Sequence, residues 1–161
     1  MTSTPDLLPQ TDTVTVNGRQ LVLYPLRLDE VRAWNRWARA EFITPALDAC
    51  KALDGQERLD REHAAFQEAK AIAFWDTPSF PIMDTTEGRL KTVELSLSRG
   101  PQPMMAAEVA AIFRDDNGLM RGSLADAAWR VYVLSGYVSA KTLLPATPAE
   151  KKTETSAPAT P

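Results

Sequence analysis

The hydrophobic pattern of this chain starts with a short segment typical of paired β-strands. Residues 13–16, TVTV, alternate polar and apolar side chains, and residues 21–24, LVLY, resume a β-rich run. Asn17-Gly18 lies between the two runs and supplies the pair of positive φ angles that a type I′ turn requires. The pattern therefore predicts a β-hairpin over residues 13–24.

After the hairpin, apolar residues recur every three or four positions, which is typical of amphipathic helices. Pro45 is expected to interrupt or kink the first of them. Residues 77–84, TPSFPIMD, hold two prolines and predict a surface loop anchored by Phe80 and Ile82. In chain order, helices are predicted over residues 28–42, 46–53, 57–75, 85–97, 105–113 and 123–140.

The boundaries and faces of these helices follow from local signals. Asp84 precedes Glu87 by three residues, and Ser123 precedes Asp126 by three, so Asp84 and Ser123 are predicted N-caps. Trp34 is expected in the core with the other inward positions of the first helix. The inward side of the second long helix is expected to consist of Leu59, Phe66, Ala69, Ile72 and Ala73.

These elements predict a mainly α fold, in which an N-terminal β-hairpin precedes a bundle of about five helices and a disordered C-terminal tail. The 161 residues suffice for one hydrophobic core, so residues 13–144 are expected to form a single globular domain with its helices between 28 and 140. Residues 1–12 are predicted to be a flexible arm, and the low-complexity residues 145–161 a disordered tail.

The composition narrows the possible environments and partners. Hydrophobic residues make up 44% of the chain, and the net charge of −3 opposes binding to nucleic acid. Cys50 is the only cysteine, so an intrachain disulfide is impossible and a reducing compartment fits. No segment resembles a signal peptide or approaches the ~20 apolar residues of a membrane span. A protein of the cytosol without a membrane anchor is expected.

The sequence offers no residue set suited to catalysis. His63 is the only histidine, and it fits a helix surface better than a general base. Cys50 fits a small buried hydrophobe better than a nucleophile. The run DDNG at residues 115–118 lacks the ligand spacing of a calcium loop, and no glycine-rich phosphate loop occurs. The chain is therefore predicted to be no enzyme, with no catalytic, cofactor-binding or metal site.

Exposed aromatic residues and the Met104-Met105 pair are the remaining candidates for function, because tryptophan is enriched among the residues that dominate binding energy and methionine adapts its shape to a partner. Ordinary core packing is the alternative for each of them. It is as plausible as surface exposure for Trp37 and Trp75. The predicted partner-binding residues are Trp37, Phe74, Trp75, Phe80 and Met104.

Two segments together resemble a known family. The opening reads VTVNGRQLVLYPLRLDEV, and the central segment reads VELSLSRGPQPMMAAEVAAIF. The latter places Leu95 to Arg99 before a Pro-containing link and then Glu108-Val109. Over roughly residues 13–140 the order of these features resembles the tail assembly chaperones of long-tailed bacteriophages and prophages. One departure is the link, where Met104 and Met105 stand in place of the family's polar helix cap.

The resemblance implies a non-enzymatic protein of the host cytoplasm that binds the tape measure protein, helps to recruit tail tube subunits and is absent from the mature virion. Self-association is a further possibility, whereas nucleic acid and membrane are not expected partners. An alternative is a structural head–tail connector or tail terminator protein that stays in the virion. An enzyme that uses His63 with neighbouring carboxylates is the least favoured reading.

Overall fold

The computed structural model describes residues 10–76 and 80–136 of the chain. The predictions for residues 1–9, for Val138 and for the tail over 145–161 lie outside these residues. The predicted fold class, a mainly helical protein with an N-terminal β-hairpin, is confirmed, and the described residues hold six helices. The elements are β1 (Asp12–Val16), β2 (Arg19–Leu23), α1 (Leu28–Cys50), α2 (Gly55–Ala71), α3 (Phe80–Met83), α4 (Thr86–Leu97), α5 (Ala106–Phe113) and α6 (Ser123–Leu134).

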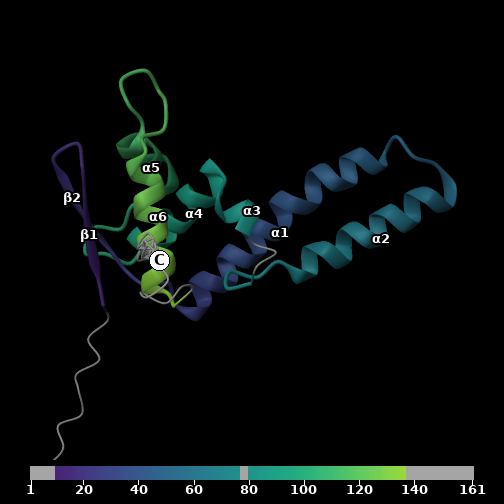
Figure 1. The fold of residues 1–161 in the computed structure, drawn as a ribbon, viewed down its shortest axis with the longest axis horizontal. Coiled ribbons are helices and arrows are strands. Elements are labelled where there is room, and N and C mark those ends of the chain that lie inside the picture. Colours follow the sequence, from purple (N-terminus) through teal and green to yellow (C-terminus); the bar gives the residue numbers. More distant parts are fainter. Residues whose placement is uncertain (1–9, 77–79, 137–161) are drawn as a thin grey trace, which may run out of the picture.

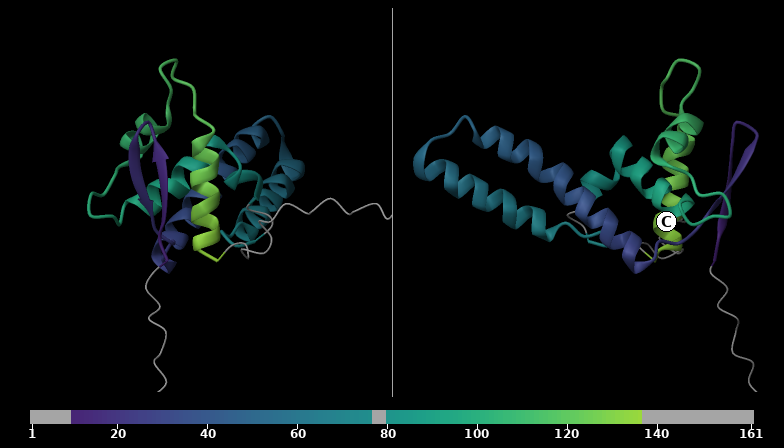
Figure 2. Two further views of the ribbon diagram at one scale, coloured as in Figure 1. Left: turned by 60° about the vertical axis from the view of Figure 1, so that its left-hand side comes forward. Right: turned by 180° about the vertical axis from the view of Figure 1, so that it is seen from behind.

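The helices are arranged as a main body and a projecting arm (Figure 1). The hairpin lies at one end of the molecule against α4 and α6, and the arm leaves the opposite end. We define the arm as α2 together with the part of α1 from Arg39 to Cys50. The right-hand view in Figure 2 also shows the arm standing clear of the main body.

The predicted hairpin is confirmed in detail. Asn17 and Gly18 have φ angles of 53° and 74°, as a two-residue primed turn requires. Val16 pairs with Arg19, and Val14 with Leu21, so the strands are antiparallel and in register. The alternation places Val14, Val16, Leu21 and Leu23 on the buried face, against the helices of the main body.

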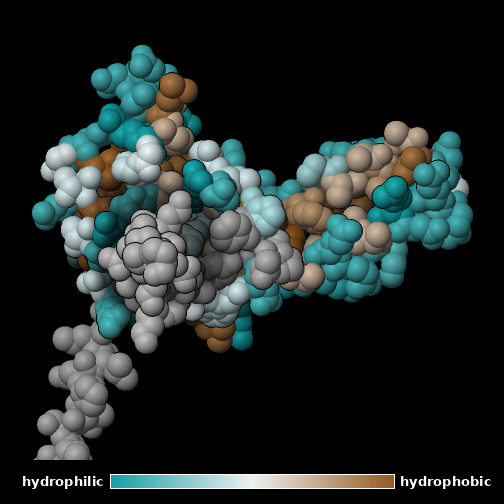
Figure 3. All heavy atoms as spheres, viewed as in Figure 1, coloured by the Kyte–Doolittle hydropathy of each residue, from teal (hydrophilic) through white to brown (hydrophobic). Residues whose placement is uncertain are grey.

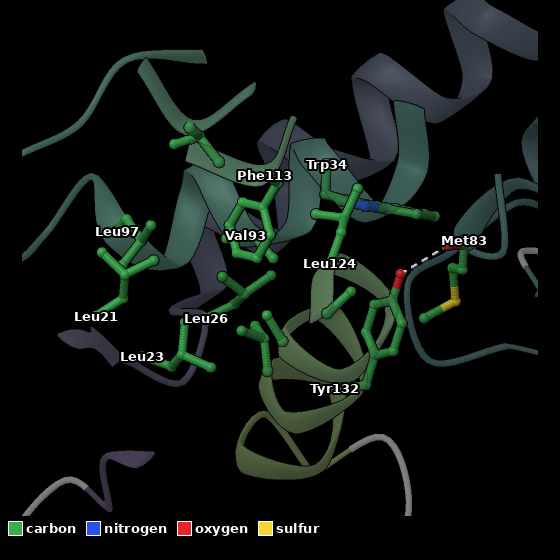
Figure 4. Packing of buried hydrophobic residues seen from close by; sticks show 14 of the residues in the cluster. Leu21, Leu23, Leu26, Trp34, Met83, Val93, Leu97, Phe113, Leu124 and Tyr132 are labelled. Atoms are coloured by element: carbon green, nitrogen blue, oxygen red, sulfur yellow. Dashed lines mark hydrogen bonds between the residues drawn. The ribbon is translucent and has the colours of Figure 1, made fainter. Parts of the chain in front are cut away.

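The hydrophobic core of the main body contains a small polar network, of which Figure 4 shows the hydrogen bond between Tyr132 and Met83. Trp34 is fully buried, as predicted, and its indole Nε1 donates a hydrogen bond to Thr92 Oγ1 at 3.1 Å. The Tyr132 hydroxyl lies 3.2 Å from Thr92 Oγ1 and donates to the Met83 carbonyl oxygen at 3.0 Å. Because these buried polar groups all have partners, the network joins α1, α3, α4 and α6 at little cost in desolvation.

The two segments that carry the family resemblance are bonded to each other. The Ser96 hydroxyl accepts from the Tyr24 N–H and donates to the Tyr24 carbonyl, both at 2.8 Å. Arg99 binds both carboxylate oxygens of Glu30, at 3.1 and 2.9 Å, and also donates to the Pro25 carbonyl. Such a two-pronged arginine contact fixes orientation as well as distance. These motif positions hold α4 against the chain between β2 and α1.

The start of α5 is stabilised in spite of its unusual link. Met105 occupies the N-cap and has no side chain able to cap a backbone N–H. The Glu108 carboxylate accepts the Met105 N–H instead, at 2.8 Å, and Val109 is fully buried. Half of a capping box therefore suffices, because the acidic residue also suits the positive end of the helix.

Both long helices differ from their predicted bounds. α1 continues through Pro45 to Cys50, with the Thr44 hydroxyl donating to the Ala40 carbonyl at 2.8 Å. α2 ends at Ala71 and not at residue 75. The next backbone groups are bound by α1 side chains: Arg39 Nε donates to the Ile72 carbonyl at 3.0 Å, and Asn35 Oδ1 accepts the Phe74 N–H at 2.7 Å. These tertiary bonds replace the next turn of helix.

Both predicted N-caps are wrong by one residue. Thr85 caps α4, because its hydroxyl oxygen accepts the Gly88 N–H at 3.0 Å, while Asp84 pairs with Arg89 at 2.6 Å. Gly122 occupies the N-cap of α6, and the Ser123 hydroxyl makes no hydrogen bond within the described part of the chain. The predicted loop over 77–84 contains the short helix α3, with Met83 buried and Ile82 packed at the edge of the core.

The prediction of a flexible arm over residues 1–12 is wrong for Asp12, which begins β1. It pairs with Leu23 across the hairpin. One carboxylate oxygen accepts from Arg130 Nη1 at 2.9 Å, and the other accepts from the Thr13 N–H at 2.7 Å. The ion pair with Arg130 connects the first residue of the strand to α6.

The pKa of Asp12 supports a prediction about acid stability. Burial raises this pKa, but the hydrogen bonds from Arg130 and Thr13, with the Arg130 charge, together lower it by more. A carboxyl group with a lowered pKa stabilises the fold above its unfolded pKa of about 3.9, and this contribution is lost as the pH falls through the folded pKa. Both side chains are more than a third exposed, so Asp12→Asn should cost less than about 1 kcal/mol near neutral pH.

Urea unfolding across the acid range checks this expectation. The free energy of unfolding of Asp12→Asn should fall less steeply below about pH 4 than that of the native chain. Asp116→Asn, in the turn after α5, is the control. Equal slopes for the Asp12 variant and the native chain would contradict the proposed role of the pair.

Candidate partner-binding surfaces

A branched series of aromatic rings runs through the core and ends at three tryptophans that are not fully buried, Trp37, Trp75 and Trp129. The centroids of rings in contact lie 5.3 to 6.3 Å apart, mostly in edge-to-face geometry, and the series branches at Phe74. This geometry is the favourable one for aromatic pairs. We call the set the aromatic chain; its members are Trp37, Trp34, Phe74, Trp75, Tyr132 and Trp129.

Trp75 forms one exposed end of the aromatic chain. Its side chain is 46% exposed although two contacts fix it. The indole Nε1 donates to the Ser135 carbonyl oxygen at 3.0 Å, and the ring packs edge-on against Phe74 at 5.8 Å. The Ser135 hydroxyl also accepts the Leu26 N–H at 2.9 Å, so this corner joins the start of α1, the end of α6 and the segment after α2. Trp75 is therefore a large apolar side chain held rigid at the surface.

Trp37 forms another end of the aromatic chain and lies in a hollow between α1 and the start of α4. It is half-buried, and its ring lies 5.9 Å from that of the buried Trp34. Three apolar side chains line the hollow together with two acidic residues and a threonine. The lining residues are Trp37, Phe42, Ile82, Glu41, Glu87 and Thr85.

The predicted partner-binding residues therefore divide. Trp37 and Trp75 reach the surface, whereas Phe74 is fully buried and Met104 is 8% exposed. Phe74 is buried because it contacts Trp34, Trp75 and Tyr132 at the centre of the aromatic chain. In this fold Phe74 and Met104 offer little surface to a partner. The side chain of Phe80 lies outside the described residues.

The arm carries an apolar surface that the sequence pattern had placed inside. Leu59 and Phe66 were expected to face inward, but they are 58% and 48% exposed. The inward positions of α2 are Ala65 and Ala69, whose small side chains let α2 lie close against α1. Figure 3 shows further hydrophobic surface along the α1 side of the arm. In the sequence, the seven-residue spacing of Leu59 and Phe66 was the one signal that these two residues share a face of α2 distinct from that of Ala65 and Ala69.

The structure places Cys50 and His63, the two residues weighed as catalytic candidates, on different helices of the arm. Cys50 is buried, and His63 lies on α2 with Gln67 as its neighbour at 3.4 Å. Within residues 10–76 and 80–136, no three His, Cys, Asp or Glu side chains are placed to hold a metal ion. None of the helices in this part of the chain combines the length and hydropathy needed to cross a membrane.

Comparisons of the chain with protein family models, curated proteins and solved structures find no match. The surfaces described above and the resemblance in the sequence thus remain the grounds for a functional proposal.

Proposed function

We propose that this chain is a non-enzymatic tail assembly chaperone of a long-tailed bacteriophage, which binds the tape measure protein and helps to recruit tail tube subunits. The observation that carries the proposal is the pair of surface tryptophans, Trp37 and Trp75, held by the buried rings of Trp34 and Phe74. A protein that protects a hydrophobic partner needs exposed apolar anchors on an otherwise polar surface.

The rigidity of the two tryptophans suits them to binding. A side chain that is already fixed loses little conformational entropy when a partner covers it, so more of the contact energy contributes to affinity. Trp75 is fixed by its hydrogen bond to Ser135, and Trp37 by its contact with Trp34. Both indoles therefore have the properties of binding anchors.

The hollow around Trp37 indicates what chemistry its partner segment has. Phe42 and Ile82 add apolar surface to its lining, and Glu41 and Glu87 add negative charge. An amphipathic helix with an apolar stripe beside lysine or arginine residues complements such a surface. We expect the bound segment of the tape measure protein to have this pattern.

Co-expression with the tape measure protein encoded nearby tests the proposal. The native chain should keep the tape measure protein soluble and co-purify with it. Trp37→Ala and Trp75→Ala should each weaken the complex by about tenfold or more, because each removes a large anchor from the interface. Leu119→Ala is the matched control, since Leu119 is 66% exposed but lies on the turn between α5 and α6.

Circular dichroism of each variant separates lost binding from lost folding. A tape measure protein that stays insoluble beside the native chain would contradict the proposal. So would full binding by the folded double variant. Recovery of the chain from purified virions would favour a structural tail or connector protein instead.

A further inference from the structure

The edge of β2 that faces away from β1 is open at two positions. The two-residue turn makes Val16 and Arg19 a hydrogen-bonded pair, so the backbone groups of Gln20 and Val22 point out of the hairpin. In the described part of the chain, the N–H and carbonyl groups of these two residues have no hydrogen-bond partner. An unpaired strand edge of this kind is a template for another extended chain.

The bonds at Tyr24, the next outward position of this edge, indicate what the open positions require. The Ser96 hydroxyl accepts the Tyr24 N–H and donates to the Tyr24 carbonyl oxygen, both at 2.8 Å. A residue of a neighbouring antiparallel strand would make the same two bonds. α4 thus completes the edge at one position and leaves Gln20 and Val22 for a partner. An extended chain suits them, because it presents an N–H and a carbonyl group on one side at every second residue.

A hollow runs along the open part of the edge. Residues 19–22 and Tyr24 form one side of it, and the end of α4 with the link between α4 and α5 forms the other. Leu97, Pro101 and Met104 supply apolar surface on that second side. Figure 4 shows Leu97 next to Leu21, whose side chain lies on the buried face of β2. A strand added to the edge would therefore place an apolar side chain in this hollow.

Arg19 gives the hollow a positive charge that the described residues leave unbalanced. The Arg19 side chain is exposed and forms no ion pair in the described part of the chain. The described residues that line the hollow include no acidic side chain. A carboxylate placed beside Arg19 would be attracted to it, so the charge favours an acidic partner.

We propose that this edge binds an extended segment of another protein as a third, antiparallel strand of the sheet. Two residues of the segment form backbone hydrogen bonds with Val22 and Gln20. The residue between them is apolar, and its side chain packs beside Leu21 in the hollow. The residue after the partner of Gln20 lies opposite Arg19 and is acidic. The bound segment thus carries an apolar residue followed two positions later by an acidic one.

The charge of Arg19 favours such a partner over a second copy of the chain. If two copies paired through this edge about a two-fold axis, Gln20 would pair with Val22 of the second copy and Leu21 would lie opposite Leu21. Arg19 would then lie opposite Leu23 of the second copy, and its charge would stay unpaired. Neither Trp37 nor Trp75 lines the hollow, so the inference is independent of the proposed function.

Amide hydrogen exchange of the full chain, followed by NMR, tests the inference with a synthetic probe. The probe is a short, end-blocked peptide with Val-Leu-Thr-Glu at its centre, which places its leucine beside Leu21 and its glutamate opposite Arg19. The Gln20 and Val22 amides should exchange freely in the chain alone and become protected by at least about tenfold when the probe is bound. Replacing the glutamate of the probe with lysine should weaken binding by about fivefold.

Variants of the hairpin test the edge and the charge separately. Gln20→Pro should weaken binding of the probe by at least about tenfold, because proline has no N–H to donate to the added strand. Thr15→Pro is the matched control: Thr15 is the cross-strand partner of Gln20, and its N–H points out of the other edge of the hairpin. Binding by Thr15→Pro should be unchanged. Arg19→Glu should reverse the preference, so that the lysine probe binds more tightly than the glutamate probe.

Several results would overturn the inference. Protection of the Gln20 and Val22 amides in the chain alone, at every concentration, would show that another part of the same chain covers the edge. Protection that appears only as the concentration of the chain rises would assign the edge to a second copy. The inference also fails if the probe gives no protection at its highest soluble concentration, or if Gln20→Pro and Arg19→Glu both bind it as the native chain does.

Discussion

Replacing Gly88 with alanine is expected to destabilise the protein by about 3 kcal/mol. A Cβ atom at this position would lie 2.0 Å from the Ile82 carbonyl oxygen, 2.9 Å from the Ile82 carbonyl carbon and 3.1 Å from Met83 Cα. All three atoms belong to the backbone, so no side chain can rotate to make room. In an open helix the same change would stabilise by up to about 1 kcal/mol.

The clash should also disturb the start of α4. The Ile82 carbonyl accepts bonds from the Thr85 N–H and hydroxyl, and the Thr85 hydroxyl oxygen caps Gly88. Moving Ile82 away from position 88 breaks this arrangement. Gly122→Ala is the control, because no described atom lies within 4 Å of its Cβ position and its φ of −58° suits alanine. Chemical unfolding of both variants checks the difference, and equal stabilities would contradict the predicted close contact.

Phe74→Ala is expected to have the largest effect among the aromatic residues, about 3–5 kcal/mol of lost stability. Phe74 is fully buried and contacts Trp34, Trp75 and Tyr132. Its removal leaves a cavity where the segment after α2 meets α1 and α6. Trp75 also loses the ring that orients it, so the variant should bind a partner less well even at temperatures where it stays folded.

The matched control for Phe74→Ala is Phe66→Ala, which removes the same ring from a 48% exposed site on α2. Its effect on monomer stability should stay within about 0.5 kcal/mol. Urea unfolding at low protein concentration compares the two variants without a contribution from self-association. A loss of stability in Phe66→Ala as large as that in Phe74→Ala would contradict the exposed position of Phe66 on the arm.

Local sequence signals predicted the helices and strands well where interactions between residues close in sequence decide the structure. The Asn17-Gly18 turn set the hairpin and its register, because few residues tolerate two successive positive φ angles. The period of the apolar residues located α1, α4, α5 and α6. The helix-breaking residues marked the boundaries between them. Capping signals were less reliable. Thr85 and Asp84 are both residue types that favour the N-cap, and only the hydrogen bond from the Gly88 N–H to the Thr85 hydroxyl oxygen identifies Thr85 as the cap.

The partner-binding candidates were harder to predict, because exposure depends on what packs against each side chain. Phe74 and Trp75 are neighbours of similar character, yet one is fully buried and the other is 46% exposed. Their positions follow from the end of α2 at Ala71, where Asn35 binds the Phe74 N–H. That hydrogen bond joins residues 39 positions apart and leaves no pattern in the local sequence.

The sequence by itself determined the hairpin and the order of the helices, since these depend on backbone preferences and on residue types. Only the tertiary structure decided which faces are buried. α2 lies against α1 through Ala65 and Ala69, because small side chains allow the closest approach, and Leu59 and Phe66 are left outside. The periodic pattern of α2 is compatible with burial of either the alanine face or the Leu59–Phe66 face. The packing of α2 on α1 therefore decides which face is buried.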